Sequence, residues 1–182
     1  MNDDTLAPES SANPIRQTCR SMVDQLAKCV QEIFPWDLVD ELEANPDLFL
    51  LDVRSRHEFD AASIRNSINV PRGILELAVD YGYEETEPVL VEAREKRIVI
   101  ICRSGNRSVL AAHTLGQMGY TDLASLRTGI RGWNDYEQPL LSTDDRQLSL
   151  DEADELLAPR IRPEQLGPPE NAATGGGTSA SR

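Results

Sequence analysis

Lysine is scarce in this 182-residue chain, because 16 of its 18 basic residues are arginine. A P-loop that cradles nucleotide phosphates requires a Gly-Lys-Ser/Thr run. The two lysines, Lys28 and Lys96, instead follow Ala27 and Glu95. The sequence therefore excludes a P-loop nucleotide site.

Cysteines are few, and long hydrophobic runs are lacking. Cys19, Cys29 and Cys102 are an odd number without close pairing, so we expect no disulfide framework and a reducing compartment. The first eleven residues carry three acidic side chains and no hydrophobic run, so we expect no secretory signal. No stretch approaches the roughly 20 apolar residues of a membrane span. These absences together predict a cytoplasmic protein.

Positively charged side chains are also few relative to negatively charged ones. The chain has 31 acidic and 18 basic residues, which gives a formal charge of −13. Nucleic acids and anionic membranes repel a polyanion, so neither is expected to be the main partner. The balance does not exclude a local basic site. The length suggests one domain with appendages, and an apolar content of 40% is enough for its core.

The two ends of the chain differ in composition from its middle. Residues 1–14 are polar and predict a flexible N-terminus, and residues 159–182 are rich in proline and glycine and predict a disordered tail. Residues 15–29 predict an extra amphipathic helix, with residues 30–140 as the main domain and 141–158 as a C-terminal helical extension. The extra helix is indicated by apolar residues that recur every three or four positions and form one helical stripe: Ile15, Cys19, Met22, Leu26, Cys29 and Ile33. We expect both cysteines of the stripe to be buried, and a short dimerisation seam is the alternative.

Apolar runs and helical patterns alternate from residue 30 onward. The strand-like runs are 30–34, 48–53, 68–70, 98–101 and 123–126, and helices are expected over 35–44, 106–118 and 133–136. Repeated strand–helix units predict an α/β fold with a mostly parallel sheet and helices on both faces.

The strongest strand pattern, Ile98 to Ile101, leads directly into the loop Cys102-Arg103-Ser104-Gly105-Asn106-Arg107-Ser108. In open α/β sheets, ligands bind beyond the carboxyl ends of the strands. Unpaired loop N–H groups, the positive end of the following helix and two arginines all favour a thiolate, so Cys102 is expected to be reactive. Gly105 permits the bend, and Ser108 is expected to cap the helix.

Four segments in this order resemble the single-domain rhodanese (thiosulfate sulfurtransferase) family over about residues 30–140. Residues 52–59 resemble its Asp-Val-Arg-x-x-x-Glu-Phe segment, and residues 64–71 its Ile-x-Gly-Ala-Ile-Asn-Val-Pro segment. Residues 102–108 match its Cys-Arg-x-Gly-x-Arg-Ser active-site loop, and residues 129–133 its Gly-x-x-x-Trp. The resemblance implies the three-layer rhodanese-like fold.

The resemblance also implies a ping-pong transfer of sulfur. The Cys102 thiolate would take the sulfane sulfur of a small anionic donor such as thiosulfate and pass it from a persulfide to cyanide or a thiol. The loop N–H groups of residues 103–108 would cradle the outer sulfur. Arg103 and Arg107 would hold the donor, although surface charge at a helix end is the alternative. No metal or organic cofactor is needed.

Other residues near the expected site have competing interpretations. Asp52 ends a strand and is favoured as a structural acceptor for the loop backbone or for Arg54. Arg54 and Glu58 are spaced to pair with each other. Arg72 follows Pro71 at a strand end, where it either reaches the donor or is solvated. His57 and His113 lack metal-ligand spacing and are expected to be structural or exposed.

The departures from the family pattern affect loop shape rather than the nucleophile. Ala62-Ser63 replaces the usual Gly-His, Asn66 replaces a glycine, and Thr128-Gly129 replaces Gly-Gly. Related phosphatases and arsenate reductases have five residues between Cys and Arg, whereas four separate Cys102 from Arg107. The sequence is also compatible with a non-catalytic partner-binding module and with a persulfide carrier or redox sensor.

Overall fold

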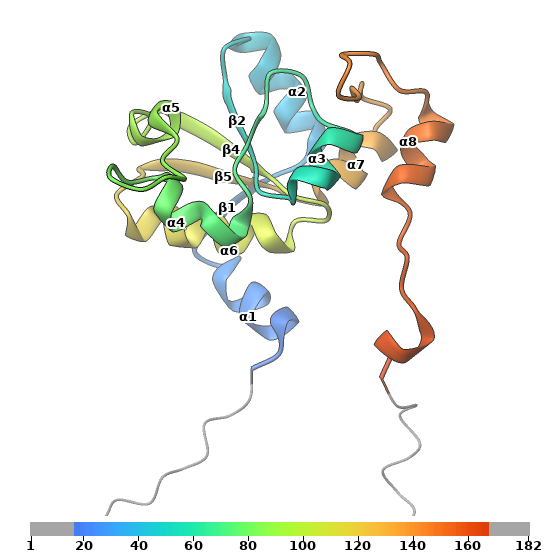
Figure 1. The fold of residues 1–182 in the computed structure, drawn as a ribbon, viewed down its shortest axis with the longest axis horizontal. Coiled ribbons are helices and arrows are strands. Elements are labelled where there is room, and N and C mark those ends of the chain that lie inside the picture. The colour runs from blue at the N-terminus through green and yellow to red at the C-terminus, as the bar shows by residue number, and fades with distance from the viewer. Residues whose placement is uncertain (1–16, 168–182) are drawn as a thin grey trace, which may run out of the picture.

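The computed structural model describes residues 17–167, so the flexible N-terminus predicted for residues 1–14 lies outside it. The same holds for residues 168–182 of the predicted tail. Figure 1 shows a central sheet with helices packed around it. The strands are β1 (Gln31–Ile33), β2 (Phe49–Asp52), β3 (Ile68–Asn69), β4 (Arg97–Ile101) and β5 (Asp122–Leu126). The helices are α1 (Cys19–Leu26), α2 (Pro35–Ala44), α3 (Arg56–Ala61), α4 (Leu75–Ala78), α5 (Pro88–Val91), α6 (Asn106–Gln117), α7 (Gly129–Asp135) and α8 (Leu150–Leu157), with 3-10 turns η1 (Arg72–Ile74) and η2 (Pro163–Gln165).

All four strand pairings are parallel, in the order β1-β5-β4-β2-β3. Strand β4 lies at the centre, where Ile100 is in register with Leu51 on one side and with Ser125 on the other. Every connection between paired neighbours is therefore a crossover, which brings helices to the faces of the sheet. The predicted α/β fold with a parallel sheet is confirmed.

Two hydrophobic layers cover the two faces of the sheet. Successive residues of β4 alternate between them: Val99 and Ile101 contribute to one cluster, and Ile98 and Ile100 to the other. The first cluster contains buried side chains from α2, α7 and α8, and the second contains side chains from α4, α5 and α6. This three-layer arrangement places the ends of β2 and β4 side by side, with helices above and below them.

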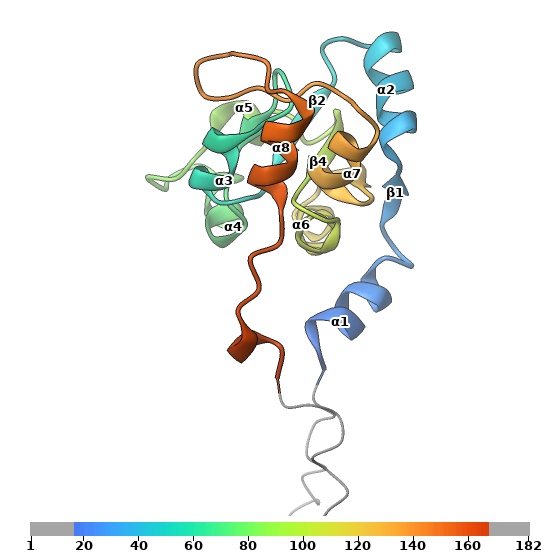
Figure 2. The same cartoon turned by 90° about the vertical axis from the view of Figure 1, so that its right-hand side faces the viewer.

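Helix α1 lies outside the three layers and packs against α6 (Figures 1 and 2). Within the helix itself only Val23 is buried. Cys19 and Cys29 are exposed, so the prediction that both are buried is wrong. The helix ends at Leu26, and the chain then turns into β1, which carries Ile33. The six-residue stripe is thus divided between two elements, and the helical period does not extend across the turn.

The segment after α7 returns across the domain. Leu141 pairs with Ser63 and with Gln147 through isolated bridges, and α8 follows with a Ser149–Glu152 capping box. Leu157, at the end of α8, is buried in the first cluster. From there the chain runs exposed to residue 167 (Figure 2). Within residues 17–167, no helix is long and apolar enough to cross a membrane.

Candidate active site

Cys102 lies at the carboxyl end of the central strand and is only 1% exposed. Its carbonyl accepts a hydrogen bond of 2.8 Å from the N–H of Ile130, and the carbonyl of Arg103 accepts one of 3.2 Å from Arg131. Both donors belong to the first turn of α7. Because N–H groups at a helix start have no partner inside the helix, they are free to hold this loop. Helix α7 therefore fixes the backbone on which the cysteine is carried.

The loop after Cys102 turns back so that its own backbone faces the thiol. Gly105 adopts φ 94°, a left-handed conformation that favours glycine, and its N–H donates to the Cys102 Sγ at 3.2 Å. Helix α6 begins at the next residue, so the sulfur lies at the N-terminal, positive end of that helix. The backbone donor that the sequence predicts beside the Cys102 sulfur is therefore present.

Ser108 does not cap α6, because Gly105 occupies the N-cap position and no side chain bonds there. The Ser108 hydroxyl lies one turn into the helix. It donates to the Gly105 carbonyl at 2.9 Å and lies 3.4 Å from the Cys102 Sγ. Its third neighbour is the Ser125 hydroxyl of β5 at 2.8 Å, and both serines are fully buried. Sequence reasoning missed Ser125, whose one signal is a hydroxyl inside the otherwise apolar run 123–126.

Gly129 provides the close contact between α7 and the loop. A Cβ at this position would lie 2.4 Å from the Cys102 carbonyl oxygen and 2.6 Å from the Ser104 nitrogen, and φ is 62°. Glycine is therefore required on both steric and conformational grounds. The preceding residue, Thr128, also has a left-handed φ of 68°, although it is not a glycine. Asn66, which also replaces a glycine of the family pattern, adopts φ 62°, a left-handed conformation that asparagine tolerates.

Asp52 and Arg54 form a fully buried ion pair below the loop. The Arg54 Nη2 lies 2.6 Å from the Asp52 Oδ2, and Asp52 also accepts from the Arg54 backbone N–H at 2.9 Å. Arg54 additionally donates to the carbonyls of Ala62 and Glu58, so it joins the end of β2 to the middle and the C-terminal end of α3. The expected structural role of Asp52 fits these contacts. The expected pairing of Arg54 with the Glu58 carboxylate is wrong, because Arg54 bonds the Glu58 carbonyl.

The Glu58 carboxylate instead pairs with Arg107 of the active-site loop. Two hydrogen bonds of 2.7 and 2.8 Å make the pair bidentate, and both side chains are about one-third exposed. The Arg107 guanidinium lowers the pKa of Glu58 to about 2. The positive charge of Arg107 is thus balanced locally. Arg103 is oriented differently, because its Nη2 donates to the Leu157 carbonyl at the end of α8, 2.6 Å away.

The remaining predicted positions lie further from the thiol or at the edge of the loop. Arg72 bonds Glu76 and also Thr114, two turns into α6, so the structure does not bring it to the loop. Ser104 of the loop and Asn106, the first residue of α6, are exposed. His57 is exposed and His113 is half-buried. Within residues 17–167, no three acidic, histidine or cysteine side chains cluster in a way that could hold a metal ion.

A family model described as "Rhodanese-like domain" matches residues 35–136. The chain belongs to the rhodanese-like family. The rhodanese-like domain therefore contains the whole Cys102 loop and ends just after α7, whereas α1 and α8 lie outside the matched region.

Individual relatives agree with this assignment. A Schizosaccharomyces pombe protein named "Putative thiosulfate sulfurtransferase, mitochondrial" is 32% identical over 114 residues, which cover 57% of this chain and 78% of the relative. The Zea mays adenylyltransferase and sulfurtransferase MOCS3-1 is 38% identical over 85 residues, covering 46% of this chain and 17% of that protein. The region of this chain that matches the maize protein thus corresponds to a small part of that longer protein.

Among solved structures, a Rhodopseudomonas palustris protein of unknown function has a TM-score of 0.63 and 26% identity. The similarity covers 69% of this chain and 96% of that one, and the protein is described as a possible tyrosine phosphatase. The rhodanese-like fold of this chain is thus shared with a protein for which different chemistry has been suggested.

Proposed function

We propose that this rhodanese-like chain is a sulfurtransferase that moves a sulfane sulfur from an anionic donor such as thiosulfate through a persulfide on Cys102. The observation that carries the proposal is the hydrogen bond from the Gly105 N–H to the Cys102 Sγ. Together with the start of α6, it builds a small cradle for negative charge on sulfur. The name of the S. pombe relative supports thiosulfate as the donor.

In the first half-reaction, the Cys102 thiolate attacks the outer sulfur of thiosulfate. A bond forms between the cysteine Sγ and that sulfur, the bond from that sulfur to the sulfonate breaks, and its electron pair leaves with sulfite. In the second half-reaction, an acceptor such as cyanide attacks the outer sulfur of the persulfide. The Cys102–sulfur bond then breaks and restores the thiolate, so one sulfur atom has been transferred.

The loop residues have separate roles in this scheme. The N–H groups of residues 103–108 stabilise charge on the outer sulfur, in the manner of an oxyanion hole. Arg103 is the better donor-binding candidate, since Arg107 is already paired with Glu58. Because Cys102 is 1% exposed, the side chains over it must move when the donor enters.

A phosphatase is the second candidate function, because the R. palustris structure is described as a possible tyrosine phosphatase. Against it stands the spacing of the loop, in which four residues separate Cys102 from Arg107. Arg107 is also held by a carboxylate, so it is not available to a tetrahedral oxyanion while that pair is formed. A persulfide carrier uses the same loop chemistry as the main proposal and differs only in the acceptor.

The test measures thiocyanate production from thiosulfate and cyanide by the purified full chain. We expect turnover by the wild type, loss of turnover in Cys102→Ser, and unchanged turnover in Cys19→Ser and Cys29→Ser, whose thiols are exposed and do not belong to the loop. Hydrolysis of an aryl phosphate without any thiocyanate would overturn the proposal and favour the phosphatase.

A further inference from the structure

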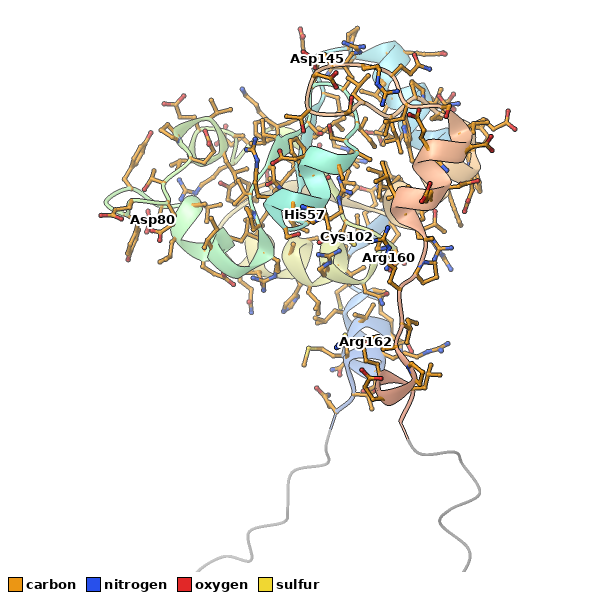
Figure 3. The ribbon with its side chains drawn as sticks, turned by 45° about the vertical axis from the view of Figure 1, so that its right-hand side comes forward. His57, Asp80, Cys102, Asp145, Arg160 and Arg162 are labelled. Carbon is orange, nitrogen blue, oxygen red and sulfur yellow. The ribbon has the colours of Figure 1, made fainter. Side chains whose placement is uncertain are left out.

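A cleft lies beside the active-site loop, between the rhodanese-like domain and residues 156–160, which end the C-terminal extension and begin the segment after it. Its volume is about 290 Å³. Leu156, Leu157, Ala158 and Arg160 form one wall, while Arg103 and His57 are among the residues of the other. Figure 3 shows His57, Cys102 and Arg160 in the same region of the molecule. The first wall lies wholly outside residues 35–136, so it is a feature of this chain beyond the family domain.

The extension is fixed to the active-site loop at this cleft. Arg103, which follows Cys102 directly, donates to the Leu157 carbonyl at 2.6 Å. The Leu157 side chain is buried in the same cluster as Ile130 and Trp133 of α7. Because α7 also holds the Cys102 carbonyl, the nucleophile and the cleft wall share one rigid support. The cleft therefore lies directly beside the active-site loop, and its wall is bonded to that loop.

The cleft carries positive charge in an acidic protein. Two of its charged residues are neutralised, since Arg54 pairs with Asp52 and Glu58 pairs with Arg107. For residues 17–167, no carboxylate lies within ion-pair distance of Arg103 or Arg160. Two arginines with unused donors favour an anion, and a carboxylate matches their planar geometry.

Size and lining indicate an organic anion. A liquid water molecule occupies roughly 30 Å³, so the cleft has room for several heavy atoms beyond those of cyanide or thiosulfate. Ala61, Leu156 and Ala158 supply apolar contacts beside the arginines. The combination suits a molecule with a short carbon chain between a charged group and the atom that reaches Cys102.

We propose that this cleft binds the sulfur acceptor, an anionic organic thiol whose carboxylate is held by Arg160 and Arg103. The proposal rests on the proposed sulfur transfer and names its acceptor class. The acceptor attacks as a thiolate after losing its proton to solvent. A bond forms between its sulfur and the outer sulfur of the persulfide, the bond from that sulfur to the Cys102 Sγ breaks, and the electron pair returns to Cys102. The product is an organic persulfide.

The test isolates the second half-reaction. The full chain is loaded with sulfur from thiosulfate, and the discharge rate is measured with 3-mercaptopropionate, 2-mercaptoethanol and cysteamine, which are anionic, neutral and cationic. We expect Arg160→Glu to lower the ratio of the discharge rate with 3-mercaptopropionate to that with 2-mercaptoethanol about fivefold or more. The same variant should raise the ratio of the rate with cysteamine to that with 2-mercaptoethanol. Arg160→Lys should retain most of the preference. Arg65→Glu, which makes the same charge change at another exposed arginine, should leave both ratios unchanged.

A direct binding measurement separates failure of this proposal from failure of sulfur transfer. Labelled Cys102→Ser protein is titrated with the unreactive thioether 3-(methylthio)propionate and followed by NMR. We expect shifts at His57 and Ala158 that Arg160→Glu abolishes. Normal discharge with unchanged ratios and no shifts would overturn the acceptor site alone. Shifts without any persulfide formation would overturn the proposed sulfur transfer while retaining an organic anion site.

Discussion

At the scale of single residues, the environment of Cys102 is set by groups that bond one another. Ser125 and Ser108 form a buried pair of hydroxyls behind the sulfur, and the Ser108 hydrogen is directed to the Gly105 carbonyl. Each hydroxyl has one hydrogen, so Ser108 cannot donate to the carbonyl and to the sulfur at once. The hydrogen bond that the Cys102 sulfur accepts therefore comes from the backbone N–H of Gly105.

Glu58→Gln tests the ion pair that holds Arg107. The pKa of Glu58 is lowered from 4.5 to about 2 by Arg107, so the stabilising charge is fully present above pH 4.5 and is lost as the pH falls toward 2. We expect the variant to unfold more easily than wild type by about 1 kcal/mol at pH 7, a modest figure because the pair is partly exposed. Urea denaturation should show this difference shrinking between pH 4.5 and 2.

The matched control for that substitution is Asp60→Asn in the same helix. Asp60 pairs with Arg56 in a more exposed setting. Such pairs contribute little, so we expect a change below about 0.5 kcal/mol at pH 7. A Glu58→Gln variant as stable as this control would contradict a role of the carboxylate in holding the loop.

At the scale of elements, the site depends on how α7 meets the loop after β4. The first turn of α7 donates to the Cys102 and Arg103 carbonyls, and Gly129 lets the two backbones approach. The buried Asp52–Arg54 pair performs a similar task for β2 and α3. The backbone around Cys102 is thus bonded to α7 on one side and, through the Val53 N–H and the Ile101 carbonyl, to the chain after β2 on the other.

Gly129→Ala adds a single methyl group, yet we expect it to slow persulfide formation strongly. The new methyl group would lie 2.4 Å from the Cys102 carbonyl oxygen, so the loop must shift. Because small displacements of reacting groups are costly, we expect persulfide formation to slow about tenfold or more. Single-turnover kinetics with thiosulfate measure this rate. Gly116→Ala meets nothing within 4 Å and serves as the control, with equal activity expected. Equal rates in both variants would contradict the account.

The sequence predicts most of these elements, but not their side-chain partners. The apolar run Ile98–Ile101 and the loop after it predict β4 and the position of Cys102, because both signals are local. The partners of the loop arginines are remote, since Arg107 meets Glu58 across 49 residues and Arg103 meets Leu157 across 54. No local pattern predicts such pairs. The end of α1 is hard to predict for a related reason, because the apolar period continues into a strand.

At the scale of the whole molecule, charge is distributed unevenly. The net charge is −13, yet residues 98–133 carry four arginines and a single aspartate. Arg160, two residues beyond the C-terminal extension, lies in the same region as Arg103. At physiological ionic strength the Debye length is about 8 Å, so a small anion at the loop responds mostly to the nearby arginines. An acidic protein can therefore keep a site that attracts anions.

Salt should weaken that attraction. We expect kcat/KM for thiosulfate to fall as sodium chloride is raised from about 10 to about 300 mM, because screening weakens the attraction of the unpaired arginines for the donor. Sucrose at matched osmolality should have no such effect and controls for changes in water activity. A rise in kcat/KM with salt would show instead that the repulsion of the whole −13 molecule dominates.

The role of Cys102 is tested most directly by the intact mass of the full chain after exposure to thiosulfate. We expect a gain of one sulfur atom that maps to Cys102, is removed by cyanide, and is absent in Cys102→Ser. An unchanged wild-type mass, or sulfur found on Cys19 or Cys29 instead, would contradict the assignment of Cys102 as the sulfur-carrying nucleophile.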